Sequence, residues 1–112
     1  MLNKDLILKA VDLKTEVIEV PEWGDSLTIT ELSGADLERW QSKAQKTNAD
    51  SAETLGELVA LSVINQDGSR MFGDKDIKAL LTKSHKPLMR IYNAAIKVNM
   101  LGEDGAAELE KN

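Results

Sequence analysis

Cysteine is absent from this chain of 112 residues, and histidine occurs once, as His85. The absence of cysteine excludes disulfides, thiolate nucleophiles and zinc sites with sulfur ligands. It is compatible with a reducing cytoplasm and does not exclude secretion. A single imidazole excludes paired-histidine metal sites, and its neighbour Ser84 would point in another direction on a helix. We therefore interpret Ser84 and His85 as residues of a helix start and not as a nucleophile and its base.

Long apolar runs are also missing, and no stretch approaches the roughly 20 apolar residues that span a bilayer. Near the start, Leu6–Leu8 is apolar but is bounded by the charged residues Asp5 and Lys9. That run is too short for a signal peptide. We expect a brief amphipathic helix between Met1 and Val11, and no membrane partner.

Basic residues are too few and too scattered to bind a phosphate backbone. Lysine and arginine number 14 against 19 acidic residues, for a net charge of −5, so nucleic acid would be repelled. The chain has no glycine-rich phosphate cradle. The acidic pairs Asp74 with Asp76 and Glu108 with Glu110 lie in polar segments and are interpreted as solvated charges. We expect no catalytic, metal or cofactor site.

The composition is that of an ordinary globular protein, with 42% hydrophobic and 29% charged residues. Two halves of a chain of this length would each be too small to bury a core. The sequence therefore predicts one domain over residues 1–112, with residues 103–112 as a frayed tail.

A turn at Val20–Asp25 is the most informative local feature, because it holds Trp23 between two strand-like segments, Thr15–Val20 and Ser26–Leu32. Pro21 fixes one backbone dihedral and Gly24 permits a left-handed one, so the turn can close. Apolar residues alternate along both segments, which predicts an antiparallel hairpin with one buried face.

Helices are predicted for most of the remaining chain. The Ser33 hydroxyl is placed to accept a hydrogen bond from the Asp36 amide and so to start the first of them, with Trp40 in its buried stripe. Further helices are expected over Glu53–Ile64, after a cap at Asp74, and after a cap at Ser84. The polar segment Gln45–Ala52 is expected to be a mobile loop.

Three details complete the helical prediction. Gly56 should weaken its helix slightly, Pro87 fits the first turn of the last helix, and Gly102 should close that helix. Its buried side is expected to consist of Leu88, Ile91, Tyr92, Ala95, Val98 and Asn99. The predicted fold is α+β: a small antiparallel hairpin or three-stranded sheet packed against four to five helices.

The segment Asn65–Ser69 has features of both a plain turn and a calcium loop. A glycine after Asp67 suits a metal-wrapping turn, but Val63 would then occupy the first ligand position and the short Asp74 the last. These mismatches favour the plain turn.

Three apolar residues are candidates for binding a partner: Trp23, Met71 and Phe72. Trp23 at the tip of a turn is either a lid over the core or an anchor for another protein, and large aromatic residues are more often buried. Met71 and Phe72 lie in a predicted loop, where they either contact another chain or, for Phe72, pack behind the next helix.

The order of these elements resembles the tail assembly chaperones of long-tailed, siphovirus-like bacteriophages. The similarity begins with Val17–Gly24 and continues with Glu31–Gly34 opening a helix. It extends through Leu58–Ser62, Asp67-Gly68 and Phe72–Asp74 to the helix Leu88–Asn99, and it spans roughly Leu6 to Asn112.

This resemblance implies a noncatalytic protein of the host cytoplasm, absent from the mature virion. It would bind the tape measure protein, keep it soluble until tail-tube subunits polymerise around it, and self-associate along it. The family supplies no agreed binding residues, so none is transferred to this chain.

The resemblance also implies a longer product made by ribosomal slippage, whose added domain recruits the major tail-tube protein. The ending Glu110-Lys111-Asn112 is compatible with an adenine-rich slippery run. Two other functions remain open: a small bacterial protein-binding adaptor or regulatory domain, and, more remotely, a hydrolase or metal enzyme.

Overall fold

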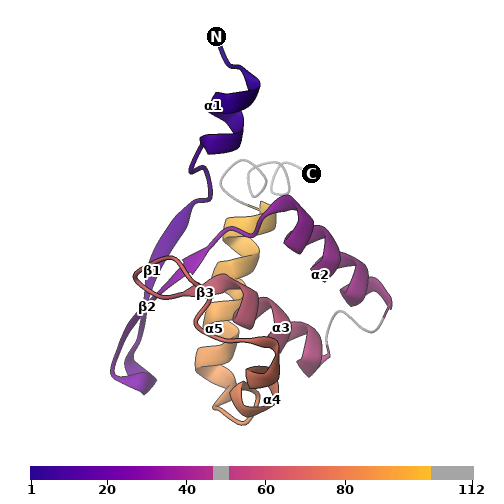
Figure 1. The fold of residues 1–112 in the computed structure, drawn as a ribbon. Coiled ribbons are helices and arrows are strands. Elements are labelled where there is room, and N and C mark those ends of the chain that lie inside the picture. Colours follow the sequence, from indigo (N-terminus) through magenta and orange to yellow (C-terminus); the bar gives the residue numbers. More distant parts are fainter. Residues whose placement is uncertain (47–50, 102–112) are drawn as a thin grey trace, which may run out of the picture.

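A computed structural model describes residues 1–46 and 51–101 of the chain (Figure 1). The described elements follow one another as α1 (Lys4–Lys9), β1 (Thr15–Val20), η1 (Pro21–Trp23), β2 (Asp25–Thr30), α2 (Gly34–Lys46), α3 (Ala52–Ser62), β3 (Val63–Ile64), η2 (Asp74–Asp76), α4 (Ile77–Leu80), α5 (His85–Ile96) and η3 (Lys97–Leu101). The last of these is a short π-helix that continues α5. The α+β class predicted from the sequence is confirmed.

The sheet has three antiparallel strands in the order β1-β2-β3. β1 pairs with β2 along its full length, from Thr15 opposite Thr30 to Val20 opposite Asp25. The alternation of apolar residues places Val20 and Ile29 on the covered face, where both are almost completely buried. The predicted hairpin is therefore present, and its second strand ends at Thr30 instead of Leu32.

The third strand, β3, corrects the prediction of a helix over Glu53–Ile64. α3 ends at Ser62, and the amide of Val63 still bonds the carbonyl of Val59 as the helix closes. Val63 then pairs with Ile29 of β2. Both strand residues are β-branched, which favours a pleated, half-buried surface over a last helical turn.

Two hydrophobic clusters form the core beneath the sheet. The larger one joins the covered face of the sheet to α3, α4 and α5 through Ile29, Val59, Val63, Leu80, Leu88 and Ile91. The smaller one joins α2 to α3 and α5 through Leu32, Trp40, Leu58 and Ala95. Trp40 is 4% exposed, and its indole NH donates to the carbonyl of Thr54, which confirms it as a core residue.

The helix starts agree with the prediction in part. The Ser33 hydroxyl accepts from the amide of Asp36, as expected. Ser84 holds the cap position of α5, but its side chain makes no capping bond. Asp74 is the first residue of η2 and not its cap; the carboxylate of Asp76 accepts instead from the amide of Gly73, at 2.8 Å.

The polar segment predicted as a loop over Gln45–Ala52 is shorter than expected. α2 extends to Lys46, Ser51 caps α3 through its side chain, and Ala52 is already helical. Residues 47–50, on which the prediction of mobility depends, lie outside the described residues, as do Gly102 and the tail at 103–112.

Gly56 has a packing role that its helix propensity alone does not indicate. It is buried in α3, and a Cβ atom built on it would come within 3.0 Å of the side chains of Ile77 and Leu81. Glycine therefore allows α4 to approach α3 closely.

α1 is present as the expected short helix, but it makes no contribution to the core. The Asn3 side chain caps it by accepting from the amide of Leu6, and none of its residues is buried. Figure 1 shows α1 projecting from one end of the molecule, with the β1–β2 turn and α4 at the other end.

Candidate interaction site

The tip of the β1–β2 hairpin is built by the residues that marked it in the sequence. Pro21 starts the 3-10 turn η1, and Gly24 closes it with a positive φ of 86°, which only glycine adopts readily. The amide of Gly24 bonds the carbonyl groups of Val20 and Pro21. Trp23 is thereby held at the tip with 39% of its surface exposed.

An ion pair fastens this tip to α5. The guanidinium of Arg90 donates two hydrogen bonds to the carboxylate of Glu22, at 2.6 and 2.8 Å. Such a bidentate ion pair fixes the relative orientation of the two side chains as well as their distance. These bonds are the main reason that the pKa of Glu22 falls from 4.5 to about 2. The same pairing raises the pKa of Arg90.

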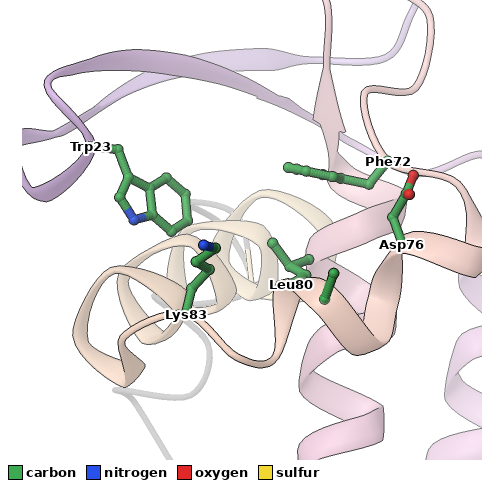
Figure 2. A pocket seen from close by; sticks show the side chains of 6 residues that line it. Trp23, Phe72, Asp76, Leu80 and Lys83 are labelled. Carbon is green, nitrogen blue, oxygen red and sulfur yellow. The ribbon is translucent and has the colours of Figure 1, made fainter.

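Beside the tip lies a surface pocket of about 380 Å³, which we call the tip pocket; its lining residues are Trp23, Phe72, Asp76, Ala79, Leu80 and Lys83. Figure 2 shows the rings of Trp23 and Phe72 on two sides of the space, with Leu80 and Lys83 below them. The lining is mostly apolar, with one acid and one base among its residues. This pattern is typical of a site for an apolar group with some control by charge.

Phe72 reaches the pocket because the chain after β3 is held against the sheet. Ile64 forms an isolated bridge with Arg70, and the amide of Met71 bonds the carbonyl of Val63. Phe72 is half-buried and packs against the larger core cluster. Met71 is 43% exposed and does not line the tip pocket.

The structure thus brings together two of the three candidates from the sequence, Trp23 and Phe72. Trp23 belongs to neither core cluster. The sequence alone does not indicate that Leu80, Lys83 and Arg90 lie beside the hairpin tip. No local pattern could have identified them, because they meet the hairpin tip only when α4 and α5 pack beside it.

The Asp67 turn is stabilised within itself. The Asp67 carboxylate accepts from both the amide and the hydroxyl of Ser69, which lowers the pKa of Asp67, and Gly68 has a positive φ of 89°. Over residues 1–46 and 51–101, no group of three or more His, Cys, Asp or Glu side chains is placed to hold a metal ion.

Comparison with known proteins gives a match among solved structures. No family model and no curated protein matches the chain. Among solved structures, the tail assembly chaperone of bacteriophage HK97 superposes with a TM-score of 0.64. The match covers 84% of this chain and 94% of that one, at 16% sequence identity.

The chain has the fold of a phage tail assembly chaperone. The resemblance inferred from the sequence is therefore confirmed at the level of the fold. At this low identity the likeness extends no further, and it assigns no role to individual residues. Among the helices that the structure describes, none has the length and hydropathy of a bilayer span.

Proposed function

We propose that this protein is a noncatalytic phage tail assembly chaperone that binds a tape measure protein and assists assembly of the tail tube. The observation that supports this most directly is the fold shared with the HK97 tail assembly chaperone over 84% of the chain. The protein acts in the host cytoplasm and leaves before the virion is complete. A longer product made by frameshifting recruits the major tail-tube protein.

The tip pocket is the proposed contact for the client. A long helical client with apolar seams presents aliphatic side chains at helical spacing, and such a helix docks by inserting them into a preformed apolar site. Because the Glu22–Arg90 pair holds the hairpin tip in place, the pocket loses little conformational freedom on binding.

Replacing Trp23 by alanine tests the pocket directly. Trp23→Ala removes one wall of the pocket, while the indole is 39% exposed and lies outside both core clusters. We expect client binding to weaken by about tenfold or more, as for an aromatic contact at the centre of an interface. The melting temperature should change by no more than about 4 °C, corresponding to roughly 1 kcal/mol or less. Titration of a tape measure segment and thermal melting measure the two effects.

The matched control is Met71→Ala, which removes a similarly exposed apolar side chain that does not line the pocket. It should leave client binding within about twofold of wild type, as for most substitutions outside a binding centre. If Trp23→Ala lowers the melting temperature clearly but leaves client binding almost unchanged, the indole is a structural lid. Stable capture of an unrelated bacterial protein, with no binding to the tape measure protein, would favour the adaptor function.

A further inference from the structure

The first 13 residues form an arm, Met1–Leu13, that exposes apolar side chains and lies away from the body of the molecule (Figure 1). Leu6 and Ile7 are each 55% exposed, and Leu8 is 76% exposed. The other exposed apolar residues of the arm are Met1, Leu2, Val11 and Leu13. Exposed apolar groups gathered on one segment are typical of a surface that another protein covers.

α1 also needs an external surface in order to be stable. It has only six residues, none of them buried. Isolated helices shorter than about 12 residues are marginal in water, because nucleation is costly and most helical stability comes from packing an apolar face. The Asn3 cap adds only on the order of 1 kcal/mol. The helix therefore gains most of its stability when Leu6 and Ile7 are covered.

The tip pocket matches α1 in size, polarity and charge. A cavity of about 150 Å³ holds a benzene molecule, so the 380 Å³ pocket has room for more than one aliphatic side chain. The acid and the base of the pocket are Asp76 and Lys83, while α1 carries Lys4 and Asp5 before its apolar residues and Lys9 after them. Opposite charges can therefore be paired on both sides of an inserted leucine or isoleucine.

The arm is held away from the pocket of its own chain. Lys14, at the base of the arm, is fastened to Glu31: its amide donates to the Glu31 carboxylate at 2.7 Å, and its carbonyl accepts from the Glu31 amide at 2.8 Å. From there β1 runs six residues to the hairpin tip, about 20 Å at 3.3 Å per residue. The arm leaves this point in the opposite direction (Figure 1). The pocket that it can fill is therefore that of another molecule.

We propose that the arm of one copy docks α1 into the tip pocket of a second copy, and that a client helix displaces it. The contact joins two different surfaces, so each copy offers one arm and one pocket. It covers the apolar arm and the apolar pocket together while no client is bound. The competition with the client rests on the proposed function; the docking between copies does not.

Three variants of the full chain test the docking. Leu6→Asp combined with Ile7→Asp places charges on the arm, where no core contact is lost. Ala79→Glu places a charge at the pocket, on an exposed residue of α4. Val17→Asp is the matched control, because Val17 is 65% exposed on β1 but belongs to neither surface.

Sedimentation equilibrium over a range of concentrations measures self-association. We expect the mean mass of wild type and of the Val17→Asp control to rise with concentration. The arm variant and the pocket variant should each associate ~10-fold or more weakly. A mixture of these two variants should associate again as a 1:1 pair, since one retains the pocket and the other the arm. A wild type that stays monomeric, or a mixture that fails to associate, overturns the docking.

Titration of a tape measure segment then tests the competition. Wild type should bind the segment more weakly as its own concentration rises, whereas the arm variant should bind with constant affinity. An affinity of wild type that does not depend on its own concentration contradicts the competition. Absence of binding by every variant contradicts the proposed function and leaves the docking between copies to be decided by sedimentation alone.

Discussion

At the scale of single residues, two adjacent residues of the hairpin tip, Glu22 and Trp23, have different roles. Glu22 holds the tip through Arg90, and Trp23 forms a wall of the tip pocket. The two side chains of the ion pair are only 30% and 37% exposed, so their charges are shielded from water more than those of an ordinary surface pair. The orientation of the indole therefore depends on a charged contact with α5 that does not itself touch the pocket.

The Glu22–Arg90 pair predicts a specific dependence of stability on pH. The pKa of Glu22 is lowered in the folded protein, from 4.5 to about 2, so the ionised carboxylate favours folding. Its contribution is fully present above about pH 4.5 and is lost as the pH falls toward 2. Glu22→Gln should therefore melt at a lower temperature than wild type at neutral pH, and the difference should vanish near pH 2.

Thermal melting of both proteins between pH 7 and pH 2 measures this difference. Glu19→Gln on the adjacent strand is a suitable control, since Glu19 is exposed and has no ion pair among those found in the described residues. A difference between Glu22→Gln and wild type that is constant over the whole pH range would contradict the role assigned to the pair.

Residues fixed by local chemistry could be predicted from the sequence, and residues fixed by distant packing could not. Pro21 and Gly24 determine the turn, so the position of Trp23 at its tip follows from the sequence. Arg90 lies 68 residues from Glu22, and nothing in its own neighbourhood indicates that partner. Helix propensity predicts only that Gly56 weakens α3 slightly, whereas the nearby side chains of Ile77 and Leu81 explain why a glycine occupies this position.

At the scale of elements, the last helix is fastened to the end of the hairpin by one side chain. The side-chain nitrogen Nδ2 of Asn99 donates to the carbonyl of Ala95 at 2.9 Å, and the side-chain oxygen Oδ1 of Asn99 accepts from the backbone amide of Leu32. Leu32 is buried beside Trp40 in the smaller core cluster. Asn99, in the π-helix that continues α5, thus links α5 to the segment between β2 and α2.

Replacing Asn99 by alanine tests this link. The variant leaves the amide of Leu32 without its acceptor, and an unpaired polar group that is removed from water costs about 1–3 kcal/mol. We expect Asn99→Ala to lower the free energy of unfolding by that amount, as measured by urea denaturation. Asn93→Ala on the exposed side of α5 should change it by no more than about 0.5 kcal/mol. If the two substitutions lower the free energy of unfolding equally, the hydrogen bond between Asn99 and Leu32 makes no specific contribution to stability.

Elements with a strong hydrophobic period were predicted correctly, whereas boundaries set by pairing were not. The alternation in β1 and β2 and the apolar stripe of α5 indicate their own structure. Val63 and Ile64 continue the apolar stripe of α3 in the sequence. They leave the helix because they pair with Ile29 and Thr28 at the edge of β2. Such a choice depends on a strand more than 30 residues away, so tertiary pairing decides it and propensity does not.

At the scale of the whole molecule, the fold is shared with the HK97 tail assembly chaperone although only 16% of the residues are identical. A pattern of apolar positions can be kept by many sequences, because cores tolerate hydrophobic exchange when volume and pattern are preserved. The arm lies outside that core, and the tip pocket lies at its edge, where Phe72 and Leu80 connect the two. We propose that the choice of partners depends on these two surfaces.

The proposed function is to keep a tape measure protein soluble, and the soluble fraction of that protein during co-expression tests it. We expect wild type to raise the soluble fraction well above its value without the chaperone, and Trp23→Ala to raise it less. A soluble fraction that is the same with and without wild type, while the chaperone itself is folded and abundant, would rule out this function.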